Sequence, residues 1–131
     1  CNAAKSDIEV SIVTPFIPDK SYVFTVTRSF YDVLIESGVH IYEYTPGFIH
    51  SKSFVVDGEY ATVGTANLDY RSFYFHLECG VWMYRTSCIA DMEADFARTV
   101  AVSTPPGRKI VHPTFMVRLG RSIMRLVAPL M

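Results

Sequence analysis

The sequence predicts a single domain of the α/β class, in which helices pack on a mixed β-sheet. Half of the 131 residues are apolar, which is enough for a packed core and too many for a disordered chain. The length suits one domain. Strand-like and helix-like segments follow one another in the order β-α-β-β-β-β-α with short links, a pattern typical of helices packed on a sheet.

The first half of the chain predicts a strand, a helix and a second strand. Residues 9–14 alternate in polarity and end at a proline, as a strand does. Ser21 is a suitable N-cap, and Gly38 stands where a helix usually ends. Residues 39–44 read as the second strand. The apolar residues that recur at helical spacing between Ser21 and Gly38 are Val23, Val26, Phe30, Leu34 and Ile35.

The second half predicts three strands and another helix. Residues 51–56 form the third strand, and Asp57-Gly58 after it signals a hairpin. Residues 61–64 and 77–84 form the fourth and fifth strands. The apolar residues that space the second helix are Ile89, Met92, Phe96 and Val100.

After residue 102 the pattern changes, so we divide the chain into a catalytic domain, residues 1–102, and a C-terminal segment, residues 103–131. Residues 103–107 are rich in proline and predict a linker. Residues 108–131 are basic and amphipathic, which suits either a helix lying in a membrane interface or a helix docked on a missing part of a larger protein. Its apolar face holds Phe115, Leu119, Ile123 and Leu126, and its basic face holds Arg118, Arg121 and Arg125.

Charge is distributed unevenly. Residues 1–95 contain six Lys or Arg and thirteen Asp or Glu, whereas residues 96–131 contain six Lys or Arg and no acid. A basic tail of this kind suits an anion such as nucleic acid or anionic lipid, or else complements an acidic partner surface.

Cysteine usage and the start of the chain indicate context. Cys1, Cys79 and Cys88 fit neither a zinc site nor a disulfide framework, which favours a reducing compartment. The chain starts without Met and runs almost at once into a strand, so we expect a fragment of a larger protein. It contains no run of about eighteen apolar residues, and no transmembrane helix is expected in it.

A group of polar residues suits phosphoryl chemistry. His50 and Lys52 are two residues apart on a predicted strand, so their side chains share one face. An imidazole is a nucleophile near neutral pH, and an ammonium group neutralises a phosphate. The Thr65 hydroxyl and the Asn67 amide can donate to the same oxygens. Together these residues predict a cup for a tetrahedral phosphoryl group.

Two carboxylates accompany this group. Glu78 stands in an otherwise apolar stretch, and a carboxylate can hold one imidazole nitrogen protonated while the other attacks. Asp57, before a glycine at a strand end, is as well explained by a turn as by catalysis. Each of these residues alone has an ordinary structural explanation, and their joint spacing is what favours a site.

The spacing H-x-K-x4-D-x6-G-[ST]-x-N, met by six positions over residues 50–67, resembles the phospholipase D superfamily. The flanking sequences are similar to those of bacterial cardiolipin synthases, and the resemblance covers nearly the whole chain. The segments that carry it are residues 38–44, 47–50, 63–73 and 126–130.

The resemblance implies a phospholipase D-like fold and an active site in which two such motifs face each other. One histidine would form a phosphohistidine intermediate and the other would act as acid and base, with no metal or other cofactor. Lys52, Thr65 and Asn67 would bind the phosphate, Glu78 would orient His50, and phosphatidylglycerol would serve as donor and acceptor with release of glycerol.

The chain holds one motif, so the resemblance implies a second motif in the N-terminal half of a longer protein at the bacterial cytoplasmic membrane. The alternative is a nuclease of the superfamily completed by homodimerisation. We expect no nucleic acid as partner, because few basic residues flank His50. Where family members often have Asn, this chain has His76, which either competes for Glu78 or lies at the rim of the site.

Four aromatic residues near the motif suit an apolar entry, although aromatic residues in α/β folds more often belong to the core. They are Phe48, Tyr70, Phe73 and Tyr74.

Overall fold

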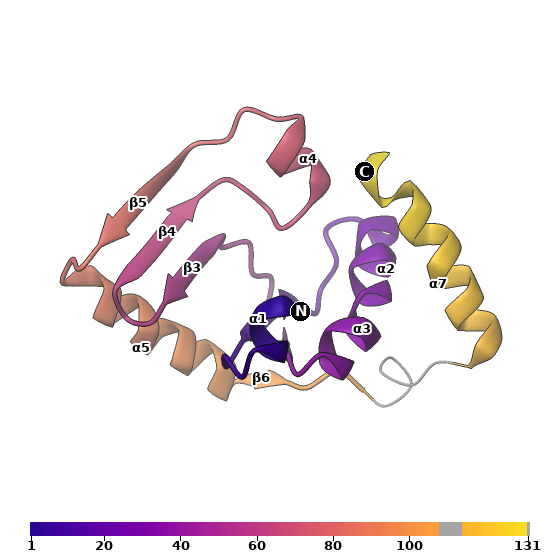
Figure 1. Cartoon of the computed structure of the whole chain (residues 1–131), viewed down its shortest axis with the longest axis horizontal. Helices are drawn as coiled ribbons and strands as arrows, with labels where there is room; N and C mark the ends of the chain where they lie inside the picture. The colour runs from indigo at the N-terminus through magenta and orange to yellow at the C-terminus, as the bar shows by residue number, and fades with distance from the viewer. Residues whose placement is uncertain (108–113, 131) are drawn as a thin grey trace.

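The computed structural model describes residues 1–107 and 114–130 and confirms the α/β class. The strands are divided between two three-stranded sheets, with the orders β1-β2-β6 and β3-β4-β5. Figure 1 shows the β3-β4-β5 sheet on the left above α5, with α2, α3 and α7 on the right. The elements are α1 (Asn2–Lys5), β1 (Ser11–Pro15), α2 (Ser21–Ser29), α3 (Tyr31–Glu36), β2 (His40–Tyr44), β3 (Ser53–Val56), β4 (Tyr60–Gly64), α4 (Tyr70–Tyr74), β5 (Gly80–Tyr84), α5 (Cys88–Ala101), β6 (Ser103–Thr104), α7 (Phe115–Val127) and the 3₁₀ helix η1 (Ala128–Leu130).

The first sheet is built around the parallel pair β1 and β2, which confirms the first two predicted strands. Their register runs from Ser11 opposite His40 to Pro15 opposite Tyr44. Parallel neighbours need a crossover connection, and α2 and α3 supply it. The core of this part consists of buried side chains from α3, from β2 and from the residue just before β2, with Leu34, Ile35 and Ile12 packed against them. The buried members are Tyr31, Val39 and Ile41.

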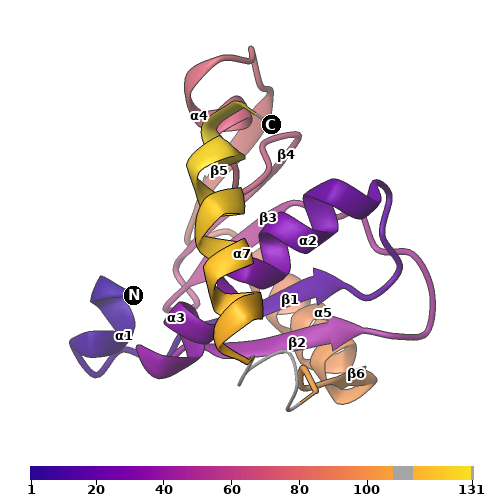
Figure 2. The same cartoon turned by 90° about the vertical axis from the view of Figure 1, so that its right-hand side faces the viewer.

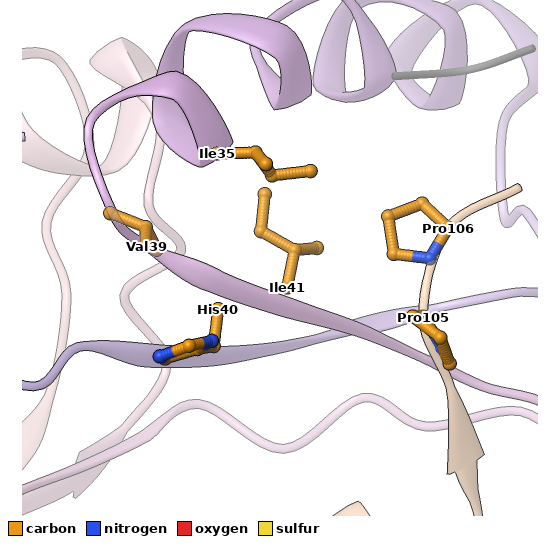
Figure 3. A pocket seen from close by; sticks show the side chains of 6 residues that line it. All are labelled: Ile35, Val39, His40, Ile41, Pro105 and Pro106. Atoms are coloured by element: carbon orange, nitrogen blue, oxygen red, sulfur yellow. The ribbon is translucent and has the colours of Figure 1, made fainter. Parts of the chain in front are cut away.

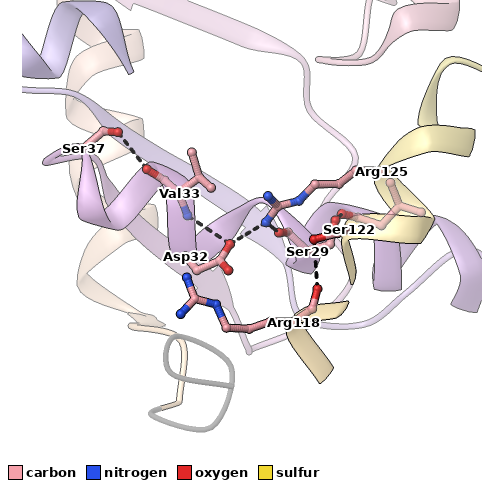
Figure 4. Close-up of polar contacts among 8 residues, drawn as sticks. Ser29, Asp32, Val33, Ser37, Arg118, Ser122 and Arg125 are labelled. Carbon is pink, nitrogen blue, oxygen red and sulfur yellow. Dashed lines mark hydrogen bonds and ion pairs between the residues drawn. The ribbon is translucent and has the colours of Figure 1, made fainter. Parts of the chain in front are cut away.

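The helix predicted from residue 21 up to residue 38 is interrupted, and α2 and α3 are separate helices. In an unbroken helix the carbonyl of Ser29 would accept a hydrogen bond from the amide of Val33. Here the guanidinium of Arg125 donates to that carbonyl, and the Val33 amide donates to the Asp32 carboxylate at 3.0 Å (Figure 4). The break therefore coincides with a contact from Arg125, which lies 96 residues after Ser29 in the chain. The spacing of nearby apolar residues does not reveal such a contact.

An ion pair with a buried carboxylate joins α2 to β2. Arg28 donates two hydrogen bonds to the Glu43 carboxylate, from Nε at 2.8 Å and from Nη2 at 3.0 Å. Glu43 is only 3 % exposed, and the Arg28 guanidinium lies 4.1 Å from the centroid of the Phe24 ring. The hydroxyl groups of Tyr31 and Thr14 share a 2.7 Å hydrogen bond, and burial raises the pKa of Tyr31 to about 12. The polar groups of this core are therefore paired with one another, which offsets the cost of removing them from water.

The second sheet is an antiparallel meander. Its first hairpin turns at Asp57 and Gly58, whose φ angles are 52° and 64°, as a tight turn with two left-handed residues requires. The Glu59 amide closes the turn by donating to the Val56 carbonyl at 3.1 Å. The predicted hairpin and fourth strand are confirmed, whereas the strand predicted over residues 77–84 begins only at Gly80.

The helix α5 confirms the second predicted helix and lies against one side of the second sheet (Figure 1). Ile89 on α5 is 1 % exposed and Ala61 on β4 is 2 % exposed, so the core of this part lies between them. The chain then enters β6, which pairs with β2 in antiparallel fashion. Residues 103 and 104, predicted as part of a linker, therefore form an edge strand of the first sheet, because backbone pairing is not visible in their composition.

The amphipathic helix predicted near the C-terminus is present as α7, which lies beside α2 (Figures 1 and 2). Arg125 donates to the buried Asp32 at 2.6 Å, so part of the basic face is directed toward this chain's own helices. Residues 108–113 and 131 of the predicted segment lie outside the described residues. Over residues 1–107 and 114–130, no helix has both the length and the apolar character needed to cross a membrane.

We expect Glu43→Gln to lower the free energy of unfolding by about 3 kcal/mol, because it leaves the Arg28 guanidinium without its carboxylate in a buried position. Chemical denaturation followed by circular dichroism measures this change. Glu36→Gln is the matched control, since Glu36 is exposed, and a change within about 0.5 kcal/mol is expected for it. Equal effects of the two substitutions would contradict the importance of the buried pair.

Candidate functional site

The His50–Lys52 segment lies at the entrance to β3 and not on the strand. β3 begins at Ser53, so the strand predicted from Ser51 started two residues too early. The Gly64 amide donates to the Lys52 carbonyl at 3.1 Å, which extends the contact with β4 as far as Lys52. His50 lies beyond the strand, where the β4 ladder no longer holds the backbone.

The side chains of this pair are held differently. The His50 side chain is exposed, and its ring is stacked on that of Phe48 with centroids 5.7 Å apart and planes 18° apart. The Lys52 ammonium donates to the backbone carbonyl of His50 at 2.9 Å. The imidazole is therefore accessible from solvent, and the ammonium group lies close to the same residue.

Asp57, one of the residues predicted for catalysis, lies in the turn at the far end of β3. It follows Lys52 by five residues, and an extended strand rises roughly 3.3 Å per residue, which separates the two by roughly 16 Å. The structure therefore places Asp57 away from His50, in a position that a hairpin turn explains.

A close approach between β4 and β5 positions Thr65. A side chain on Gly64 would run into the carbonyl of Cys79, so this position has room only for glycine. The Thr65 amide donates to that carbonyl at 2.9 Å, and the Cys79 amide donates to the Thr65 hydroxyl oxygen at 3.0 Å. The same hydroxyl donates to the carboxylate of Glu78.

Glu78 is an acceptor in this cluster and lies before β5, not within it. Hydrogen bonds from Thr65 and Ser72, together with the nearby His76 and Lys52, hold the pKa of Glu78 below its ordinary value. The carboxylate therefore stays ionised at neutral pH. Lys52 precedes β3 and Glu78 precedes β5, so both lie at the same end of the β3-β4-β5 sheet.

The imidazole nearest to this carboxylate is that of His76. Nδ1 of His76 lies 3.9 Å from Oε1 of Glu78, whereas no hydrogen bond or ion pair joins Glu78 to His50, both of which the structure describes. His76 thus lies close to Glu78, and its competition with His50 for that carboxylate stays a prediction. The expected role of Glu78 in orienting His50 stays a prediction.

The segment between Thr65 and Glu78 contains residues that the sequence reasoning missed. The short helix α4 was not predicted, although Asp69 three residues before Ser72 is a typical N-cap signal. The Asp69 carboxylate accepts from the Ser72 backbone amide at 2.7 Å, and the Ser72 hydroxyl accepts from the Asn67 backbone amide at 3.0 Å. Ser72 is buried, and its hydrogen bonds link the exposed Asn67 to the cluster around Glu78.

The aromatic residues near the motif lie on the surface and not in the core. Phe48, Tyr70, Phe73 and Tyr74 are all between 47 and 75 % exposed.

Two hollows of this chain lie elsewhere. One of about 240 Å³ lies between α3, β2 and the residues after β6, and includes His40 (Figure 3). Another of about 430 Å³ lies between α2 and α7. None of the predicted site residues lines either hollow.

The donor set of the cluster suits an anion. It combines an ammonium group and an accessible imidazole around one end of the second sheet, where the one proton of the Thr65 hydroxyl is donated to Glu78. Among the residues that the structure describes, no group of three or more His, Cys, Asp or Glu is arranged to hold a metal ion.

Comparison with known proteins confirms the resemblance carried by the motif. Residues 1–100 match the family described as cardiolipin synthase, PLD-like domain. A cardiolipin synthase from Geobacillus sp. (strain WCH70) is 41 % identical over 134 aligned residues, which cover 98 % of this chain and 26 % of that protein. A cardiolipin synthase from Geobacillus kaustophilus (strain HTA426) is 42 % identical over 130 residues, covering 98 % and 26 %.

An uncharacterized protein from Streptococcus mutans serotype c is 42 % identical over 134 residues, which cover 98 % of this chain and 28 % of that protein. The chain therefore spans about a quarter of the length of the relatives that it matches.

We expect Thr65→Val to raise the pKa of Glu78 toward its ordinary value of 4.5, because the substitution removes the hydrogen bond that lowers it most. As the pH falls, Glu78 in the variant would take up its proton at a higher pH than in the unsubstituted chain. Carbon-13 NMR titration of the side-chain carboxyl measures this shift. Thr62→Val is the matched control, and an unchanged titration of Glu78 in Thr65→Val would contradict the assigned hydrogen bond.

Proposed function

We propose that this chain, which belongs to the family of cardiolipin synthases with a phospholipase D-like domain, supplies one half of a phosphatidyl-transfer site in a longer protein. Membership places the chain in an enzyme family. The substrate, the intermediate and the division of the site between two halves are our proposal.

The observation that carries the proposal is the meeting of four functional groups at one end of the β3-β4-β5 sheet. His50 and Lys52 precede β3, Thr65 follows β4, and Glu78 precedes β5. Backbone hydrogen bonds from Gly64 to Lys52 and from Thr65 to Cys79 hold these ends together. A phosphodiester placed here would meet a nucleophile and several donors at once, which is the arrangement that phosphoryl transfer requires.

In the first step that we propose, an imidazole nitrogen attacks phosphorus of phosphatidylglycerol. The bond from phosphorus to the glycerol oxygen breaks, and glycerol leaves with a proton from the second histidine of the site. Lys52 and Asn67 bind the phosphate oxygens, and Thr65 joins them by turning its hydroxyl from Glu78 to the phosphate. Lys52 offsets the negative charge that develops on these oxygens. No metal or other cofactor takes part.

In the second step, the terminal hydroxyl of a second phosphatidylglycerol attacks the phosphohistidine. The nitrogen–phosphorus bond breaks, the second histidine takes the hydroxyl proton, and cardiolipin is released. Each step needs two histidines at opposite sides of one phosphorus, and His50 supplies one of them. The other would come from a second motif in the N-terminal half of the longer protein, so the isolated chain would be inactive.

Of the two carboxylates near the motif, Glu78 is better suited to a role in the reaction than Asp57. Glu78 is ionised at neutral pH and belongs to the cluster, so we propose that it orients an imidazole in the complete site. Because His76 is its nearest imidazole, docking of the second half would have to bring His50 and Glu78 together. Asp57, at the far end of β3, is better explained by the turn.

The alternative, a nuclease completed by two copies of this chain, has less support. Residues 1–95 contain thirteen acidic and six basic residues, and a phosphate backbone is bound mainly through Lys and Arg.

Phosphatidylglycerol as substrate also implies a location at the bacterial cytoplasmic membrane, through the longer protein.

We expect the longer protein to convert phosphatidylglycerol to cardiolipin in the presence of EDTA, with the product followed by thin-layer chromatography. His50→Ala should lower turnover by about 1,000-fold or more, because it removes a group that forms or breaks a bond to phosphorus or moves a proton. His40→Ala is the matched control, since His40 is an exposed histidine on β2 outside the cluster, and its activity should be unchanged.

Survival of activity in His50→Ala would contradict the assigned site. Cleavage of a nucleic-acid phosphodiester without any formation of cardiolipin would contradict the assigned substrate and favour the alternative.

A further inference from the structure

The helix α7 carries two faces of opposite character, and its basic side is used within the chain. Arg125 donates to Asp32 at 2.6 Å and to the Ser29 carbonyl (Figure 4). Its guanidinium lies 5.1 Å from the centroid of the Phe30 ring. The Asp32 side chain is 9 % exposed. This buried contact sets the rotation of α7 about its own axis, because moving Arg125 would leave the buried Asp32 without its partner.

The opposite side of α7 is apolar and exposed. Five side chains on it are between 48 and 79 % exposed, which is unusual for residues of this size. At 100° per residue they fall within roughly 100° of the helix circumference and extend over roughly 16 Å. No charged residue lies among them. We call this set the α7 apolar face, and its members are Phe115, Met116, Leu119, Ile123 and Leu126.

Charge around this face indicates what covers it. α7 itself contains three arginines and no acidic residue, and Asp32 neutralises one of them, Arg125. Arg118 is exposed on α7 and lies next to the apolar face on the helix circumference. An apolar strip bordered by positive charge fits the acyl boundary and head groups of an anionic bilayer.

The position of α7 relative to the site agrees with this fit. η1, which continues α7, contacts α4, and both figures of the whole chain show the C-terminus beside α4 (Figures 1 and 2). α4 carries the exposed Phe73 and Tyr74, and Glu78 follows its end by four residues. A bilayer that contacts α7 would therefore also approach the segment that leads into the polar cluster.

We propose that α7 lies in the interface of an anionic lipid bilayer with its apolar face inserted among the acyl chains. Arg125, which the sequence pattern placed on the basic face, is the anchor that directs the apolar face outward. The inference deepens the proposed function and rests on it only in taking the bilayer as the source of the substrate.

The first test uses the 131-residue chain and vesicles of phosphatidylcholine with or without phosphatidylglycerol, with binding measured by flotation. We expect binding that increases with phosphatidylglycerol and that the double variant Leu119→Gln/Ile123→Gln weakens by about tenfold or more. The matched control is Ile8→Gln/Val102→Gln, which removes equally exposed apolar groups elsewhere without changing charge. Absence of binding by the unsubstituted chain, or equal binding by both variants, would overturn the proposal.

The second test needs no substitution and so does not depend on the folding of a variant. The longer protein is reconstituted with phosphatidylglycerol that carries a photoactivatable diazirine on its acyl chain, and the cross-linked residues are mapped by mass spectrometry. Cross-links within residues 115–126 support the proposal. Cross-links confined to other segments would mean that protein covers the α7 apolar face, and would overturn it.

Self-association provides a third readout. A dimer in solution that Leu119→Gln/Ile123→Gln disperses would make the face a contact between copies and would also overturn the proposal. Vesicle binding requires no turnover, so its failure in an active enzyme would sink this inference alone. Intact binding with no formation of cardiolipin would sink the proposed function alone.

Discussion

The close approach of β4 and β5 at Gly64 is the constraint on which the polar cluster depends. Because Gly64 lacks a side chain, its backbone can lie against the Cys79 carbonyl, where any other residue would collide. That approach lets Thr65 exchange two hydrogen bonds with Cys79 and brings its hydroxyl to Glu78. The carboxylate, the hydroxyl and the Lys52 ammonium then share one end of the sheet, where a lowered pKa keeps Glu78 charged.

Two ion pairs with buried carboxylates hold together the helices and the β1-β2-β6 sheet of the other half of the chain. The Arg28–Glu43 pair joins the crossover helix α2 to β2, and the Arg125–Asp32 pair joins α7 to the helices beneath it. Each places a charge among apolar side chains, where losing one partner is costly. The Arg125–Asp32 pair lies at the break between α2 and α3. The same arginine therefore positions α7 and accompanies the division of the crossover into two helices.

Much of this arrangement could be predicted from local patterns. Alternation and spacing located β1, β2, β4 and α5, and Asp57-Gly58 located the hairpin, because these signals act over a few residues. Spacing also named His50, Lys52, Thr65 and Glu78 as one group. Long-range contacts were missed: the split at Ser29 involves Arg125, and β6 is a strand only because β2 offers it a partner.

The sequence by itself determined the α/β class, the family motif and the residue types of the candidate site, since these depend on composition and on spacing along the chain. Only the tertiary structure decided how the groups meet. It set Asp57 apart from His50 along β3, paired Glu78 with His76, and turned the apolar side of α7 outward. These outcomes depend on distances and orientations between segments far apart in the chain, and those are set by packing and by the pairing of buried charges.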